Sequence, residues 1–217
     1  MGFMSIVQQI IGGFGTTLFI FFFTLLFSMP LGIIFALARM SKFKPLNLFM
    51  QVCISILRGT PLMLQLIVVF FMPYYVFGIK LSTGWRVYAA LIGFSINYAA
   101  YFGEIFRAGI QAVPVGQHEA AEVLGYTKGQ AFLRIILPQV IKRILPSITN
   151  EVVTLVKDTS MAFTVSYQEM FTIGKQIANS QTSFVPFIVA GVFYYVFNAI
   201  VGFVMGRVEK RMNYYKM

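Results

Sequence analysis

The sequence predicts an all-α integral membrane protein that crosses the bilayer several times. Hydrophobic residues make up 58% of the 217 residues, charged residues only 11%, and the mean hydropathy is +0.78. Soluble domains have about 25% charged residues, so this composition excludes a soluble globular enzyme, and it also excludes a disordered chain. Because one helical span needs about 20 apolar residues, the chain length suits five or six helices with short loops.

Five apolar segments are long enough to serve as membrane-spanning helices. The first is free of charge but contains Pro30, which predicts a kink, and the second is interrupted by Pro61 and Pro73. The last exceeds one span, so we expect its first part to form a loop or an interfacial segment, with Pro186 near the start of the helix. The five segments are Thr16–Ala38, Gly59–Ile79, Val87–Ile110, Leu145–Tyr167 and Gln176–Gly206.

The connections between these segments are polar. A basic stretch from Arg39 to Pro45 ends the first helix, and a short loop from Lys80 to Arg86 precedes the third. The longest connection, about Gln111 to Arg143, separates the third segment from the fourth, and a basic tail from Arg207 to Met217 follows the last. The chain therefore has one connection large enough to carry structure of its own.

The basic residues are distributed unevenly between the two sides of the membrane. The net charge is +10, and membrane proteins concentrate Lys and Arg in cytoplasmic loops, so this charge does not indicate nucleic-acid binding. We expect the N-terminus outside and the C-terminus in the cytoplasm of a bacterial cell, with the protein in its inner membrane. The predicted inner side carries Arg39, Lys42, Lys44, Lys128, Arg134, Lys142, Arg143, Arg207, Lys210, Arg211 and Lys216, and the outer side only Lys80, Arg86 and Lys175.

The long cytoplasmic connection is predicted to contain two short helices. The first covers about Gln117 to Leu124, and Gly125 follows it as a C-terminal cap. Thr127 then begins a second helix, with Gln130 three residues later in a capping-box pattern, and Pro138 is expected to end it. A helix–glycine–helix unit on the cytoplasmic face is typical of a docking element for a soluble partner.

Four motifs in the chain resemble those of the polar amino acid family of ABC importer permeases. The EAA loop of ABC permeases is matched by Glu119, Ala120, Ala121, Gly125, Ile135, Leu137 and Pro138. Segments similar to that family's are Arg58–Gln65 (RGTPLMLQ), Tyr101–Gln117 and Leu155–Ser160 (LVKDTS). The resemblance implies a single transmembrane permease domain over residues 1–217, with five helices in the type I ABC importer permease fold and a coupling-helix loop at about 111–143.

The resemblance also implies the partners. A second permease subunit would complete the path, and an identical copy is favoured over a paralogue. A pair of ATPase subunits would supply the energy, and an extracytoplasmic binding protein would deliver an amino acid substrate. The chain has no G-x-x-x-x-G-K-[ST] phosphate loop, so we expect no catalytic residue and no cofactor here, with ATP and Mg²⁺ on the ATPase. The residues expected to contact that ATPase are Gln117, Glu119, Ala120, Ala121, Leu124 and Gly125.

The fourth segment carries the charges that bear on the substrate. Glu151 and Asp158 are seven residues apart, so they share one helix face about 10.5 Å apart along the axis, with Leu155 between them. An ionised residue at the bilayer centre costs about 2.5–3.5 kcal/mol, so something must offset these charges. A cationic amino acid (arginine, lysine or histidine) would meet both carboxylates, whereas glutamine, the next candidate, would leave one unpaired. The alternative is that neighbouring helices hold the acids, for instance through Arg107 or Glu104.

Three more residues complete the predicted substrate site. The third segment adds Asn97 and Tyr98, and Ser160 ends the matched LVKDTS segment. Asn97 is placed either to donate to a substrate carboxylate or to form a hydrogen bond between helices, and the sequence favours neither. Lys157 is expected to be structural.

Two other classes of protein compete with a transport subunit of this kind. An intramembrane enzyme or a metal protein would need a convergent set of side chains, but the chain has one histidine, His118, and one cysteine, Cys53. A proton-driven carrier or a channel could use Glu151 and Asp158 as a relay. The EAA loop argues against a carrier or a channel, because neither needs an ATPase-docking element.

Overall fold

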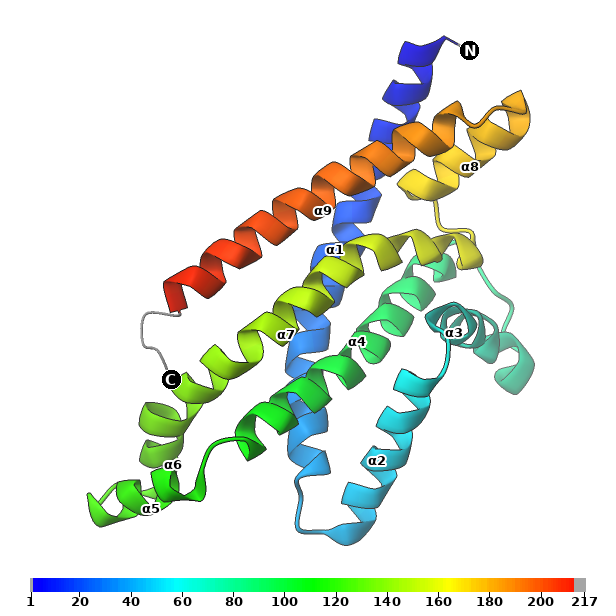
Figure 1. Cartoon of the computed structure of the whole chain (residues 1–217). Coiled ribbons are helices and arrows are strands. Elements are labelled where there is room, and N and C mark those ends of the chain that lie inside the picture. Colours follow the sequence, from blue (N-terminus) through cyan, green and yellow to red (C-terminus); the bar gives the residue numbers. More distant parts are fainter. Residues whose placement is uncertain (1, 213–217) are drawn as a thin grey trace.

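The computed structural model describes residues 2–212, and every regular element in that range is a helix (Figure 1). The fold is all-α, as predicted, whereas Lys216 and the end of the basic tail lie outside the described residues. The α-helices are α1 (Phe3–Arg39), α2 (Lys44–Gly59), α3 (Leu62–Phe77), α4 (Trp85–Gln111), α5 (Val115–Val123), α6 (Lys128–Ala131), α7 (Leu137–Asp158), α8 (Met170–Gln181) and α9 (Val185–Met212). A π-helical turn, η1 (Phe132–Ile136), joins α6 to α7, and a 3₁₀ segment, η2 (Thr159–Val165), follows α7.

Three helices in the described range, α1, α4 and α9, are long and apolar enough to cross a membrane, and the bent pair α2–α3 makes a fourth if it counts as one span. Helix α1 begins at Phe3, well before the predicted Thr16, and it continues through Pro30 to Arg39. In α9, Pro186 is the second residue, as expected near a helix start.

The second predicted segment is a broken helix rather than a single run. An amphipathic helix, α2, which the prediction missed, already begins at Lys44 and ends at Gly59. The chain then bends by 112° before α3. Thr60 is extended because it precedes Pro61, which is the N-cap of α3. Pro73, by contrast, lies inside α3 and does not interrupt it.

The long connection between α4 and α7 has the predicted caps but not the predicted end. Gly125 has φ +75° after α5, and the N–H of Tyr126 donates to the Ala121 carbonyl at 3.0 Å, as in a Schellman motif. Thr127 and Gln130 form the predicted capping box at the start of α6.

Pro138, however, does not end the second helix, and this expectation is wrong. Proline lacks an N–H but fits the first turn of a helix, and Pro138 lies in the first turn of α7, directly after η1. The helical path therefore continues from α6 through α7. The fourth predicted segment accordingly begins at Leu137 instead of Leu145, and its end, from Thr159, is 3₁₀.

The core lies where α1, α4, α7 and α9 meet. Two close approaches set the packing of α1 on α4: a Cβ atom added at Gly32 would lie 2.8 Å from Cβ of Phe102, and one added at Gly103 would lie 3.0 Å from Cβ of Phe35. The buried side chains of this cluster include Ile20, Phe21, Phe94, Tyr98, Phe102, Val152, Leu155, Val156 and Phe197. Figure 1 shows α5 and α6 at the opposite end of this bundle from α8.

The segment after η2 is a helix, so of the two expected forms, a loop or an interfacial segment, the loop is wrong. Gln176 to Gln181 complete α8, so only a short turn separates α8 from α9. Glu169 caps α8: its buried carboxylate accepts the N–H groups of Phe171 (2.7 Å) and Thr172 (2.6 Å) and the hydroxyl of Tyr194 on α9 (2.7 Å). The cap therefore also fastens α8 to α9.

Candidate functional site

The two acids of α7 face one cavity of about 260 Å³. Glu151, Thr154 and Asp158 line it from α7, because positions i, i+3 and i+7 lie on one side of a helix. The hydroxyl of Tyr98, on α4, donates to Oδ2 of Asp158 at 2.7 Å. The complete lining is Thr60, Leu62, Asn97, Tyr98, Tyr101, Glu151, Thr154 and Asp158.

Three elements far apart in sequence build this acidic cavity. The break between α2 and α3 supplies Thr60 and Leu62, α4 supplies the amide and the two phenols, and α7 supplies the acids. An unbroken helix would continue past Thr60, so the break itself forms one wall. Thr60 was absent from the predicted site, although the X-Pro signal at Pro61 marks the break in the sequence.

Four of the six predicted substrate-site residues come together in the cavity: Glu151, Asp158, Asn97 and Tyr98. Leu155 does not line it, because that side chain is fully buried in the hydrophobic core against the neighbouring helices. Ser160 also lies outside the lining, and its hydroxyl donates to the carbonyl oxygen of Lys157 at 2.7 Å.

Asn97 makes a hydrogen bond between helices. Its Nδ2 donates to Oε1 of Gln65 at 2.9 Å and to the carbonyl of Leu57 at 3.3 Å. The structure therefore contains the hydrogen bond between helices that was the second predicted alternative, and Asn97 also lines the cavity. Gln65 was not among the predicted residues, and no local spacing pattern connects it with Asn97.

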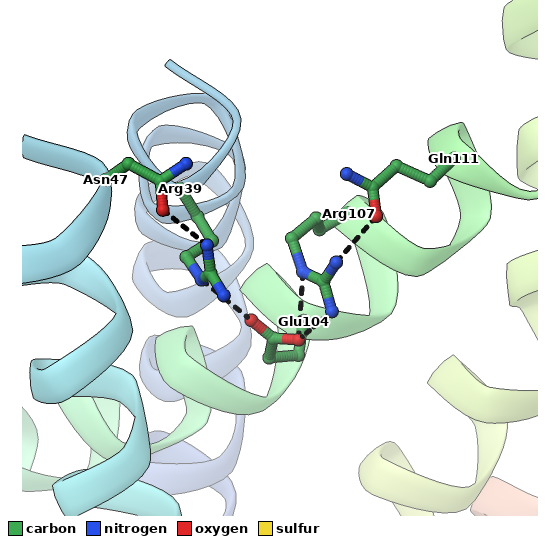
Figure 2. Close-up of polar contacts among 5 residues, drawn as sticks. All are labelled: Arg39, Asn47, Glu104, Arg107 and Gln111. Atoms are coloured by element: carbon green, nitrogen blue, oxygen red, sulfur yellow. Dashed lines mark hydrogen bonds and ion pairs between the residues drawn. The ribbon is translucent and has the colours of Figure 1, made fainter. Parts of the chain in front are cut away.

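A separate charged cluster occupies the other end of α4 (Figure 2). Nη2 of Arg107 lies 2.6 Å from Oε2 of Glu104, and Nε of Arg39, on α1, lies 4.0 Å from Oε1 of the same carboxylate. Nη1 of Arg39 also donates to Asn47 on α2, and Nη1 of Arg107 donates to Gln111 at 2.6 Å. Arg39, which contacts both Asn47 and Glu104, thus ties α1, α2 and α4 together.

Glu104 and Arg107 consequently do not neutralise the acids of α7. Within residues 2–212, both ion pairs at 4.0 Å or less involve Glu104, so Glu151 and Asp158 form no salt bridge at that distance. Lys157 is exposed, and Arg58 stacks over the ring of Tyr101, with its Cζ atom 5.2 Å from the ring centroid. The acidic cavity therefore holds two carboxylates and a hydrogen-bonded phenol, and neither carboxylate forms a salt bridge within 4.0 Å in the described range.

The predicted docking helix, α5, presents a largely exposed surface. Gln117, Glu119, Ala120 and Gly125 are exposed, and the side chain of Leu124 is 72% exposed. Ala121 differs, because it is buried at 1% exposure and faces its own chain. Val115 and Val123 add further exposed apolar area at this end of the bundle. Apolar side chains gathered at a protruding tip are typical of an interaction surface.

Comparison with known proteins places the chain among transport proteins. A candidate glutamine transport system permease protein, GlnP, of Rickettsia bellii is 38% identical over 189 residues, which cover 86% of this chain and 85% of that protein. The arginine transport system permease protein ArtQ of Bacillus subtilis is 35% identical over 207 residues, covering 95% of this chain and 93% of that one.

A solved structure has the same fold. The crystal structure of an amino acid ABC transporter with histidines superposes with a TM-score of 0.86 at 32% identity, covering 97% of this chain and 99% of the other. Residues 28–214 match the family described as "binding-protein-dependent transport system inner membrane component". With its all-helical fold and its permease relatives, the chain belongs to the family of inner-membrane components of binding-protein-dependent transport systems.

Proposed function

We propose that this chain is the permease subunit of an ATP-driven importer of polar amino acids, with a preference for cationic ones. The observation that carries the preference is the pair of acids, Glu151 and Asp158, which face one cavity and form no salt bridge within 4.0 Å in the described part of the chain. A relative that is named for arginine transport and a structural neighbour described with histidines support the same class of substrate.

The chemistry of the cavity favours a ligand with two positive groups. The α-ammonium of arginine or lysine would meet one carboxylate, and the side-chain cation would meet the other. Two unneutralised carboxylates in a low-dielectric cavity repel each other, so such a ligand removes an electrostatic cost. Histidine meets the same requirement when its ring is protonated.

Glutamine is the second candidate substrate, because the GlnP relative is named for it. It would satisfy one carboxylate through its ammonium group and leave the other unpaired. A negatively charged amino acid would add repulsion, so glutamate ranks below both.

In this proposal α5 docks on a separate ATPase, through Gln117, Glu119, Ala120, Leu124 and Gly125. Its exposed apolar tip supports this role. ATP and Mg²⁺ would bind to the ATPase, whose closure would pull two docking helices together and move the spans as rigid bodies between inward-open and outward-open states. The second docking helix would come from a second permease subunit, preferably an identical copy, and a binding protein outside would deliver the amino acid.

The proposed topology has five spans in one permease domain, namely α1, the broken pair α2–α3, α4, α7 and α9, with the N-terminus outside. The charges of α7 keep it from resembling an ordinary apolar span, but its two acids, Glu151 and Asp158, face the acidic cavity. The distribution of basic residues supports this orientation.

The test is uptake into proteoliposomes that contain this chain, its ATPase and its binding protein. We expect ATP-dependent uptake of labelled L-arginine, with unlabelled lysine competing more strongly than glutamine, and glutamate not competing. Stronger competition by glutamine would assign the second candidate. Uptake that needs only a proton gradient and no ATPase would refute the proposal in favour of a secondary carrier.

A further inference from the structure

We infer that Gln65 is a positioning residue for the substrate cavity: its amide holds the break between α2 and α3 in place and fastens it to Asn97 of α4. This inference rests on the proposed function, because it assumes that the acidic cavity receives the amino acid. Gln65 itself does not line the cavity, so any effect must pass through the residues that it holds.

The break leaves backbone groups that need partners. The last carbonyls of a helix lack intrahelical donors, and Pro61 has no N–H to offer to the end of α2. Nε2 of Gln65 supplies the missing donor, because it lies 2.7 Å from the carbonyl oxygen of Leu57 and 3.1 Å from that of Thr60. It also lies 2.9 Å from Oγ1 of Thr60. One amide group therefore bridges both sides of the 112° bend.

The other end of the same amide points to α4. Oε1 of Gln65 accepts a 2.9 Å hydrogen bond from Nδ2 of Asn97, whose side chain is only 4% exposed. The next residue, Leu66, is fully buried against Gly93, where an added Cβ atom would lie 2.7 Å from Cδ2 of Leu66. Gly93 is one helical turn before Asn97, so α3 is fastened to α4 by an apolar contact and a polar contact side by side.

These contacts determine where one wall of the cavity lies. Thr60, Leu62 and Asn97 all line it. Thr60 and Leu62 lie at the bend, and Asn97 is hydrogen-bonded to Gln65, which holds the bend. The acids lie on a different helix, α7. If the amide is lost, Thr60 and Leu62 are free to move relative to Glu151 and Asp158, and the cavity no longer has a fixed shape for the ligand.

The principal variant is Gln65→Met, which keeps the length and unbranched shape of the side chain but can neither donate to the carbonyls nor accept from Asn97. Its matched control is Gln176→Met, at an exposed glutamine on α8. Both are purified with the ATPase, and binding of radiolabelled L-arginine and L-glutamine is measured separately. We expect Gln65→Met to weaken binding of the preferred amino acid about tenfold, because the buried amide of Asn97 loses its acceptor on Gln65 and the carbonyls of Leu57 and Thr60 lose their donor. The control should stay within about twofold of the wild type.

Two further measurements separate positioning from a general loss of structure. The maximal uptake rate at saturating substrate should change little in Gln65→Met, because the docking helix is untouched, whereas a poorly assembled subunit would lose rate and affinity together. A cysteine at Thr60, in a chain whose native Cys53 is replaced by alanine, should also react with a small maleimide at a different rate when Gln65 is methionine. If Gln65→Met does not assemble, Gln65→Asn, whose amide is one methylene short, is measured in the same way.

The outcomes are distinguishable from failure of the proposed function. If the wild-type complex binds neither amino acid, the proposed substrate class is wrong, and the labelling rate at Thr60 alone decides the role of Gln65. If Gln65→Met binds as the wild type does and the labelling at Thr60 is unchanged, Gln65 is not a positioning residue.

Discussion

The hydroxyl of Tyr98 donates a 2.7 Å hydrogen bond to Oδ2 of Asp158 and thereby joins α4 to α7 at the acidic cavity. A phenol that donates to one carboxylate oxygen fixes the plane of the carboxylate and leaves its other oxygen, Oδ1, for a ligand. Tyr98 is itself packed in the hydrophobic core, so its position does not depend on the ligand.

Removal of the Tyr98 hydroxyl should lower the affinity of the cavity for its ligand without abolishing binding. We expect Tyr98→Phe to reduce the affinity of the purified permease–ATPase complex for L-arginine about three- to tenfold, the usual effect of losing one hydrogen bond. Tyr195→Phe, at an exposed tyrosine on α9, is the control. Equal affinities for the two variants would show that Asp158 is oriented by other groups.

The two acids should be needed for cation binding but not for assembly. We expect Glu151→Gln and Asp158→Asn each to weaken L-arginine binding by about tenfold or more, because each replaces a charge-assisted contact with a neutral one. Glu209→Gln, on α9, should have no effect, and all three variants should purify with the ATPase in normal amounts. Binding at wild-type affinity in both cavity variants would make these acids structural and would remove the basis for the cationic preference.

Two adjacent positions on α7 should respond differently to the same substitution. Thr154 lines the cavity, so Thr154→Trp should fill it and abolish uptake in a protein that still folds. Leu155 is fully buried in the core, so Leu155→Trp should overpack it, at a cost of about 1–3 kcal/mol, and lower the thermal stability in detergent. A Leu155→Trp protein that is stable but blocked would place this residue in the path.

The cap of α5 should matter for coupling. Gly125 has φ +75°, where a Cβ atom is strained by about 1–2 kcal/mol, so Gly125→Ala should disturb the end of the docking helix. We expect it, like Glu119→Lys, to reduce co-purification with the ATPase and transport-coupled ATP hydrolysis. Gly129→Ala is the matched control, because Gly129 lies in α6, where an added Cβ atom meets nothing within 4 Å. Normal coupling in both Gly125→Ala and Glu119→Lys would argue that another surface docks.

The topology can be tested with single cysteines in a chain that lacks Cys53. Ser82, between α3 and α4, and Lys128, at the start of α6, are both exposed. A cysteine at Ser82 should react with an impermeant maleimide added to intact cells, whereas one at Lys128 should react only after the membrane is opened. The reverse pattern would place the docking helix outside the cell.

Local signals in the sequence predicted the features that depend on neighbouring residues. Thr127 and Gln130 are three residues apart, and that spacing alone is enough for a capping box. Gly125 is a glycine because the backbone there has a positive φ. The shared face of Glu151 and Asp158 likewise follows from helical periodicity.

Features that depend on which helices become neighbours were not accessible from the sequence. The seven-residue spacing of the acids does not show whether Thr154 or Leu155 lies beside them in the cavity. That depends on how α4 packs against α7, because the packing determines which side of the acidic face of α7 is covered. The partner of Asn97 is 32 residues away in sequence, on a helix whose direction is set by the bend at Pro61. The prediction for Pro138 was wrong because the sequence pattern of a proline that follows the end of one helix is the same as that of a proline in the first turn of the next helix.

Because the helical path continues without a break through η1 into α7, the two ends of α7 move together as parts of one rigid rod. The 22 residues of α7 extend over about 33 Å, with η1 at one end and Asp158 at the other. A tilt of about 10° around one end of a rod of this length displaces the other end by about 6 Å. If α5 docks on an ATPase as proposed, a movement of the short helices would arrive at the carboxylates as a shift comparable to the length of an amino acid side chain. A flexible hinge at Pro138 would instead bend in response to the same movement, and the carboxylates of α7 would then be displaced less.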